Sequence, residues 1–193
     1  FDGKVALVTG AGRGLGRAHA RLLASRGARV VVNDLGTSGA GSGADASPAQ
    51  AVVDEIHAAG GEAVASLESV TEGHRIVEQA LDHFGRIDLV VNNAAVRREV
   101  AFSDLGYDKW RDVLGVALDG PYLCCRAALP HLQRAQGRAA IVNIGGLSAH
   151  VGAARRAHVE PVLPSAITSW SPRIRSAGGA DGPGPNGLFQ SVW

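Results

Sequence analysis

Residues 4–34 read KVALVTGAGRGLGRAHARLLASRGARVVVND and decide the fold. In order, they hold an apolar strand, a glycine-rich turn, a helix, a second apolar strand and an acidic residue. This order is typical of a βαβ unit that binds a dinucleotide. The four glycines of the turn leave room for the backbone to approach a pyrophosphate, and the N-terminus of the next helix supplies free N–H groups and a positive dipole end.

Asp34 lies eighteen residues after Gly16, at the carboxyl end of the second strand. A carboxylate at this place can accept hydrogen bonds from both hydroxyls of a ribose, so the sequence predicts NAD rather than NADP. Arg13 leaves the second alternative open, because a basic residue in this turn can contact a 2′-phosphate. Against it, Asp34 would repel such a phosphate by about 4 kcal/mol at a separation of about 4 Å and an effective dielectric constant of 20.

The composition is that of one ordinary globular domain: 193 residues, 46% hydrophobic and 19% charged, with a net charge of +1. Such a charge argues against a nucleic-acid or membrane partner bound by bulk electrostatics, and no apolar run reaches the ~18 residues of a membrane span. Adjacent Cys124 and Cys125 cannot bridge without severe strain, which favours a reduced, cytoplasmic setting. The seven histidines form no pair with metal-binding spacing, so no metal site is predicted.

Strands and helices alternate along the chain up to residue 145, which predicts an α/β fold with a doubly wound, Rossmann-type parallel sheet and helices on both faces. Thr71 is the expected N-cap of the third helix, and the small polar residues 36–47 are expected to form a surface loop. The expected strands lie near 4–9, 28–33, 62–67, 88–92 and 139–145, and the expected helices near 14–26, 48–59, 71–84, 107–117 and 120–134.

The spacing of Thr9, Gly10, Gly14 and Gly16, together with VVNNAA at 90–95, resembles the short-chain dehydrogenase/reductase family. Within it, FDGK at the start, NDLG after the second strand and ESVTEG after the third look most like the hydroxyacyl-CoA dehydrogenase domain of peroxisomal multifunctional enzymes. The resemblance covers the chain to about residue 158. It implies the strand order 3-2-1-4-5 and NAD-dependent interconversion of a secondary alcohol and a ketone, with a 3-hydroxyacyl thioester as one candidate substrate.

The resemblance also implies which residues bind the cofactor. Ser69 and Val70 lie where the family places the adenine, and the end of the fourth strand lies beside the second ribose. Ala95 stands where the family usually has glycine. The full predicted cofactor-binding set is Thr9, Gly10, Gly12, Arg13, Gly14, Leu15, Gly16, Asp34, Ser69, Val70, Asn92, Ala94 and Ala95.

The family's catalytic residues are a tyrosine, a lysine four residues later, a serine and an asparagine, and none stands at its aligned position. The serine falls on Gly146, the tyrosine on or near His158, the lysine on Val162 and the asparagine on Ala117. His158 is the candidate for proton transfer, since imidazole is the commonest general acid and base, with a surface histidine as the alternative. Ser148 is the candidate for polarising the carbonyl, with an ordinary loop serine as the alternative.

Two other pairs of residues are expected to have structural rather than catalytic roles. Tyr122 and Arg126 imitate the Tyr-x-x-x-Lys spacing, but they precede the fifth strand and are not expected to act. The two cysteines are expected to pack in the core rather than act as nucleophiles.

Residues 159–193 contain five of the eight prolines and no sustained helical or strand period. They are predicted to be a non-homologous, disordered tail after a nucleotide-binding domain of residues 1–158, so that the sheet is C-terminally truncated and its fifth strand is an edge. A homo-oligomer is typical of the family, but it is not expected for this chain.

Three functions therefore remain open. The chain is an NAD-dependent dehydrogenase of impaired activity, an inactive protein that binds NAD, or a structural partner of an intact paralogue. Turnover of alcohols and ketones separates the first from the second, and co-purification with a full-length relative would indicate the third.

Overall fold

A computed structural model describes residues 1–37, 45–97, 99–135 and 139–146, and the backbone of 189–192. Strand β1 lies within a parallel sheet of the order β3-β2-β1-β4-β5-β6. The predicted Rossmann-type fold and the order of its first five strands are confirmed. The strands are β1 (Val5–Thr9), β2 (Arg29–Asn33), β3 (Glu62–Ser66), β4 (Leu89–Asn92), β5 (Ala140–Ile144) and β6 (Phe189–Val192).

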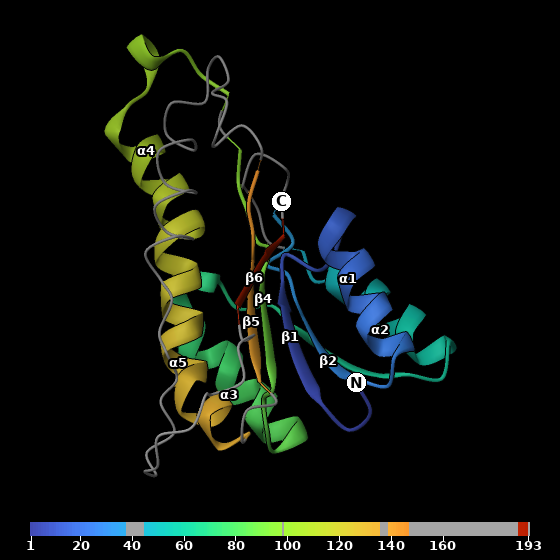
Figure 1. The fold of residues 1–193 in the computed structure, drawn as a ribbon. Helices are drawn as coiled ribbons and strands as arrows, with labels where there is room; N and C mark the ends of the chain where they lie inside the picture. The colour runs from blue at the N-terminus through green and yellow to red at the C-terminus, as the bar shows by residue number, and fades with distance from the viewer. Residues whose placement is uncertain (38–44, 98, 136–138, 147–188, 193) are drawn as a thin grey trace, which may run out of the picture.

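Helices cover both faces of the sheet (Figure 1). The pair α1 and α2 lies against one face, and α3 and α5 lie against the other, where they pack side by side. Helix α4 runs through a π-helical turn directly into α5. The helices are α1 (Gly14–Ser25), α2 (Ser47–Ala58), α3 (Gly73–Phe84), α4 (Tyr107–Leu114) and α5 (Gly120–Arg134), and the short turns are η1 (Val70–Glu72), η2 (Phe102–Asp104) and η3 (Gly115–Asp119).

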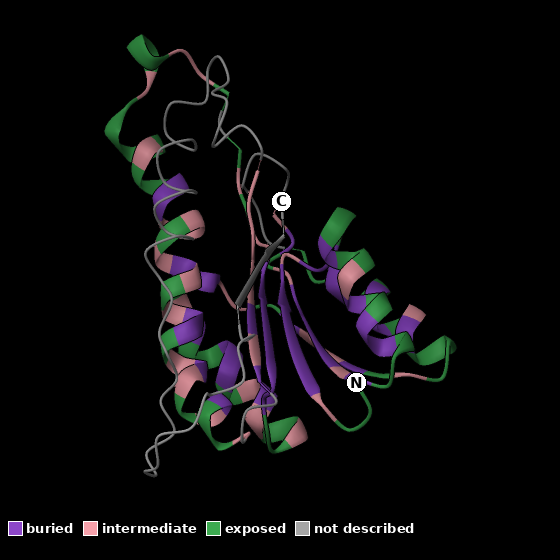
Figure 2. Cartoon of the chain, in the orientation of Figure 1, coloured by how far each residue is buried: buried purple, intermediate pink, exposed green. Residues whose placement is uncertain are grey.

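Two apolar cores result, one on each face of the sheet. In β1, Ala6 and Val8 pack into the core under α1 and α2, whereas Leu7 packs into the core under α3 and α5. The central strands are buried on both faces (Figure 2), as expected for a parallel sheet between two helical layers. Cys124 and Cys125 belong to the second core, which confirms that they pack inside.

A buried carboxylate holds the amino ends of β1, β4 and β5 together. Asp88 Oδ2 accepts hydrogen bonds from Val5 N at 2.9 Å and Arg86 Nε at 2.8 Å, and its Oδ1 accepts one from Arg86 Nη2 at 2.6 Å. The Asp88 backbone also donates to Val5 O and accepts from Ala140 N. The carboxylate raises the pKa of the Arg86 guanidinium, chiefly through this hydrogen bond.

We expect Asp88→Ala to lower the free energy of unfolding by about 2–3 kcal/mol, because it leaves the buried amide of Val5 without an acceptor. Arg86→Ala should cost under about 1 kcal/mol, since that guanidinium is half exposed and its loss leaves the Val5 bond in place. Urea unfolding of both variants measures the difference. Equal losses would show that the ion pair, and not the amide bond, carries the stability.

The structure corrects two details and adds one strand. Thr71 does not cap the third helix: Ser69 caps η1, where its Oγ accepts from Thr71 N, and α3 begins at Gly73 with Glu72 as its N-cap. The predicted gap between the helices at 107–117 and 120–134 is filled by η3.

The added strand is β6, which pairs in parallel with β5, so that β5 is not the edge predicted from the sequence. Four residues are too few to show a period, and the unpaired backbone of an edge strand can pair with almost any extended segment. The rest of the predicted tail, 159–188 and Trp193, lies outside the described residues, as does most of the predicted loop, at 38–44.

Candidate functional site

The turn between β1 and α1 can be built only with glycine at several positions. Gly10 and Gly14 have φ values of +63° and +52°, in the left-handed region that other residues avoid. A Cβ at Gly16 would collide with Gly10 O and lie 2.5 Å from Asn93 Nδ2. The turn is therefore packed tightly behind Gly16, whereas the space in front of Gly14 is open.

We expect Gly16→Ala to lower the free energy of unfolding by about 1–3 kcal/mol, the usual cost of overpacking, and to weaken any ligand held by the turn. Gly106→Ala is the matched control, because a Cβ there meets nothing within 4 Å. Urea unfolding compares the two. A neutral Gly16→Ala would show that the turn can widen.

The N-terminus of α1 is free to receive an anion. Its N-cap is Arg13, whose backbone is extended and whose side chain makes no capping hydrogen bond, and its first turn carries no acidic residue. Leu15 is 65% exposed, so it does not bury this end. The first N–H groups of a helix have no partner inside the helix, and those of Gly14, Leu15 and Gly16 fit a pyrophosphate.

Asp34 lies directly beside this turn. Its Oδ2 accepts a hydrogen bond from Gly12 N at 2.8 Å, and its Oδ1 accepts one from Gly36 N at 2.8 Å. A Cβ at Gly12 would lie 2.8 Å from Asp34 Oδ2 and 2.8 Å from Pro48 Cβ, so glycine is needed for this approach. The half-buried carboxylate thus stands at the carboxyl end of β2, where a ribose would meet it.

A cluster of hydrogen bonds joins the ends of β1 and β4. Thr9 Oγ1 accepts from Asn93 N at 3.0 Å and from Ala94 N at 3.1 Å, and it donates to Val91 O at 3.4 Å. Asn93 Nδ2 donates back to Thr9 O at 2.9 Å and Gly10 O at 3.1 Å. Asn93 is absent from the predicted site although it holds the glycine turn, and the Asn-Asn pair after an apolar strand is the signal that could have found it.

A second asparagine missed by sequence reasoning supports the segment that contains Ser69. Asn33 is buried, and its Nδ2 donates to Ser66 O at 3.3 Å, Ser66 Oγ at 3.3 Å and Glu68 O at 2.8 Å. It thereby fixes the chain as it leaves β3. Val70 follows and is buried, within 3 Å of the position that a Cβ of Gly120 would take.

At the carboxyl ends of β4 and β5, Asn92 pairs with Asn143. Asn92 Nδ2 donates to Asn143 Oδ1 at 2.8 Å and to Cys125 Sγ at 3.2 Å. Asn92 is 5% exposed, and its Oδ1 is buried without a hydrogen-bond partner among the residues that the structure describes. Ala94 is half-buried beside it and Ala95 is exposed.

Arg13 points toward the segment between β2 and α2. Its Nη1 donates to Thr37 O at 3.3 Å, and its charge contributes to lowering the pKa of Asp45, which is set mainly by the backbone and side-chain hydrogen bonds from Ser47. A groove of about 270 Å³ opens next to Arg13, between α1 and α2, with Arg17 and Glu55 on its rim. Arg17 donates two hydrogen bonds to Glu55. Among the described residues that line the groove, Arg13 is therefore the basic residue that has no acidic hydrogen-bond partner.

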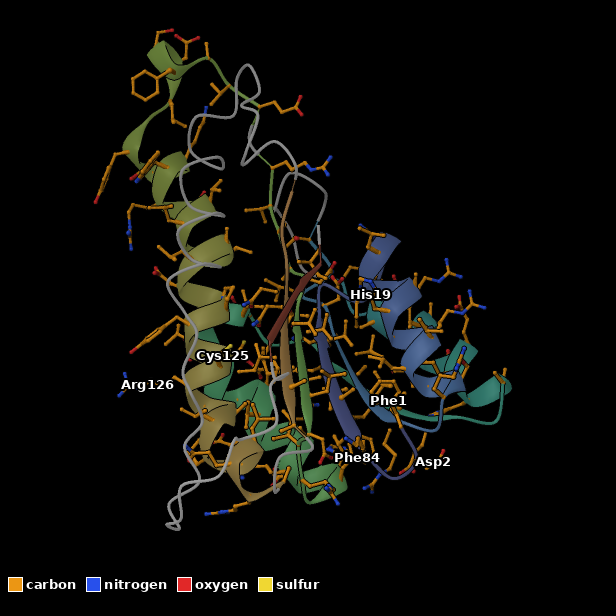
Figure 3. The ribbon with its side chains drawn as sticks, in the orientation of Figure 1. Phe1, Asp2, His19, Phe84, Cys125 and Arg126 are labelled. Carbon is orange, nitrogen blue, oxygen red and sulfur yellow. The ribbon has the colours of Figure 1, made fainter. Side chains whose placement is uncertain are left out.

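Only some of the candidate catalytic positions lie within the residues that the structure describes. Ser148 and His158 lie outside the described residues, Gly146 is half-buried after β5, and Ala117 lies in η3. The pair Tyr122 and Arg126, by contrast, lies on α5, where Arg126 Nη1 donates to the Tyr122 hydroxyl at 3.1 Å. Both residues are exposed, and Arg126 points away from the sheet (Figure 3).

The described part of the chain lacks two further features. No helix there has the length and apolarity to cross a membrane. Nor do three or more His, Cys, Asp or Glu side chains gather there as metal ligands would.

Burial keeps both cysteine thiols protonated. Desolvation, with a smaller contribution from Cys125, raises the pKa of Cys124 to about 12, and desolvation also raises the pKa of Cys125, partly offset by its hydrogen bond to Asn92. The folded protein therefore holds these protons above pH 9, where the unfolded chain releases them.

We expect this difference to make stability fall with pH. The contribution of Cys124 is fully present below about pH 9 and is lost toward pH 12, at roughly 1.4 kcal/mol per pH unit. Urea unfolding at several alkaline pH values measures the slope, and Cys124→Ala should have a shallower one. Equal slopes would mean that Cys124 titrates alike in both states.

Known proteins match most of the described chain. A family model described as short chain dehydrogenase matches residues 4–158. Over 134 residues, or 69% of this chain, the sequence is 50% identical to the peroxisomal multifunctional enzyme type 2 of Mus musculus and 48% identical to that of Drosophila melanogaster. The chain spans only 18% and 22% of the lengths of these two enzymes.

A solved structure supports the same relation. The crystal structure of a short chain dehydrogenase from Mycobacterium avium superposes with a TM-score of 0.76 and 36% sequence identity. The match covers 87% of this chain and 61% of that chain.

Proposed function

The chain belongs to the short chain dehydrogenase family of oxidoreductases, and we propose that it binds NAD(H) in preference to NADP(H). The observation that carries the proposal is Asp34, hydrogen-bonded to Gly12 N beside the uncapped N-terminus of α1. A carboxylate in this position favours a free 2′-hydroxyl and repels a 2′-phosphate.

Different residues of the site would hold different parts of the cofactor. The glycine turn and the first amides of α1 would hold the pyrophosphate, and Asp34 the adenosine ribose. Val70 would face the adenine, and Asn92 with Ala94 would face the second ribose. Bound NAD would supply a hydride acceptor for the oxidation of a secondary alcohol, and this chain's residues would bind and orient the cofactor.

Calorimetric titration tests the proposal. We expect NAD or NADH to bind at least tenfold more tightly than NADP or NADPH at one ionic strength. Equal affinities would show that Asp34 does not contact the ribose. If neither NAD(H) nor NADP(H) binds, the proposal is refuted.

A second candidate, binding without turnover, is favoured by the aligned catalytic positions. Gly146, His158, Val162 and Ala117 replace the serine, tyrosine, lysine and asparagine that the family uses. If the chain turns over at all, we propose a secondary alcohol or its ketone as substrate, with a 3-hydroxyacyl thioester among the first to test.

Partner and location remain proposals of the same kind. A chain that binds NAD without turnover could serve as the structural partner of an intact paralogue, and co-purification with a full-length relative tests this. We propose a cytoplasmic location from the reduced adjacent cysteines, whereas two relatives are peroxisomal by name. Imaging of the protein in its source cells decides between the two compartments.

A further inference from the structure

Two neighbouring residues of α5, Cys124 and Cys125, contact two different places at the carboxyl ends of the strands, where we propose that the dinucleotide binds. Asn92 Nδ2, at the end of β4, donates to Cys125 Sγ at 3.2 Å. Cys124 Sγ donates to Val70 O, just after β3, at 3.8 Å. Cys125 lies on the side of α5 that faces the sheet (Figure 3), and both thiols are buried.

These two contacts lie on opposite sides of the point where the strand order reverses. In the order β3-β2-β1-β4-β5, the reversal falls between β1 and β4. A dinucleotide bound across such a point places one nucleotide over each half of the sheet. Asp34 assigns the adenosine to the β2 and β3 side, where Val70 lies, so the nicotinamide half falls on the side of Asn92.

We propose that the two cysteines are positioning residues for separate halves of the cofactor site: Cys124 for the adenosine half through Val70, and Cys125 for the nicotinamide half through Asn92. The proposal rests on the proposed function above. It assigns neither thiol a contact with the cofactor.

The amide of Asn92 has little freedom to rotate. Its Nδ2 is shared between Cys125 and Asn143 Oδ1, and Asn92 and Asn143 are also paired in the register of β4 and β5. Within the described parts of the chain, the buried Oδ1 has no donor. Buried polar atoms are almost always hydrogen-bonded, so the position of this amide is set by the two contacts of its Nδ2.

Two glycines allow α5 to lie close to Val70 and to the start of α3. A Cβ on Gly120 would lie 2.7 Å from Val70 Cγ2, and one on Gly73 would lie 2.5 Å from Cys124 N. The backbone of α5 therefore lies directly against the start of α3 at Gly73, and the side chain of Val70 packs directly on the backbone of α5 at Gly120. A shift of α5 at Cys124 moves Val70 with it.

Both sulfurs have the protonation state that these bonds need. A neutral thiol at Cys124 can donate to a carbonyl, and the sulfur of Cys125 can accept from an amide. The raised pKa values of the two thiols keep them neutral at physiological pH.

The experiment uses two probes on the full chain, NADH for the whole site and ADP for the adenosine half alone. We expect Cys125→Ala to weaken NADH binding by about threefold to tenfold and to leave ADP binding within twofold, because one hydrogen bond is lost on the nicotinamide side. Cys124→Ala should weaken NADH and ADP by the same factor, about two- to fivefold.

Two further variants separate positioning from loss of packing. Cys125→Ser keeps a hydrogen-bonding group and should recover most of the NADH affinity. Asn143→Ala removes the other partner of Asn92 without emptying the helical core, and it should reproduce the effect of Cys125→Ala on NADH alone. It also serves as the test if Cys125→Ala does not fold.

The outcomes are distinguishable. Wild-type protein that binds neither probe refutes the proposed function. Wild-type protein that binds both probes, with a Cys125→Ala or Asn143→Ala variant that lowers both affinities equally, or with cysteine variants that change neither affinity, refutes the positioning roles and leaves the proposed function intact.

Discussion

Asp34→Ala is expected to weaken NAD binding by about tenfold to a hundredfold. The loss of one hydrogen bond from a ribose hydroxyl to this charged carboxylate is enough for such an effect, since a bond to a charged group is worth about 1.5–3 kcal/mol, or roughly tenfold to a hundredfold in affinity. NADP binding should stay the same or tighten, because the repulsion of the 2′-phosphate disappears while Arg13 remains near. The ratio of the two dissociation constants, measured by calorimetry at one salt concentration, is the readout.

Two controls separate the ribose contact from other effects of the substitution. Asp54→Ala removes the same charge from the exposed face of α2, and it should leave the ratio unchanged. Asp34→Asn tests the role of charge, because the amide keeps an oxygen for the N–H groups of Gly12 and Gly36. Unchanged affinity in Asp34→Ala would show that the carboxylate only braces the turn.

The sequence predicts the fold well because the relevant signals are local. Each of the first five strands is a short apolar run that ends at small or polar residues, and the helices carry stripes with a 3.6-residue period. The glycine turn is equally local, since positive φ values and close approaches exclude other residues there. Asp34 follows from its place after the second strand, and the structure sets it against Gly12.

The supporting asparagines are harder to predict, because their roles exist only in three dimensions. Asn93 bonds to Thr9 and Gly10 more than eighty residues earlier in the chain, and Asn33 holds a segment that begins after the next helix. No local pattern reports such partners. The same holds for β6, whose partner β5 is more than forty residues away.

The π-helical turn η3 is a further feature that periodicity does not reveal. Its five residues lie between two regular helices, and an insertion of this kind shifts the helix face without interrupting the helix. A pattern of apolar residues then looks like two helices with a break between them. The predicted helices at 107–117 and 120–134 correspond to α4 and α5, and only the π-helical turn that joins them was missed for this reason.

The second large effect concerns catalysis: we expect dehydrogenase turnover to be absent or very low even where NAD binds. General acid and base catalysis contributes ~10²–10⁴-fold, or about 3–5 kcal/mol, and the aligned tyrosine and lysine positions hold His158 and Val162. The serine and asparagine positions hold Gly146 and Ala117, which have no side chain that can polarise a carbonyl or hold a proton. Because such residues act as one unit, the separate losses do not simply add.

The assay follows NADH with a panel of secondary alcohols, ketones and 3-hydroxyacyl thioesters, on protein whose NAD binding has been measured first. Binding without turnover is the expected result. His158→Ala is the decisive variant. The family's tyrosine aligns on or near His158, and an imidazole titrates close to neutral pH. Turnover at an ordinary enzymatic rate that His158→Ala abolishes would show that histidine has replaced tyrosine, and that the site is catalytic with a different proton donor.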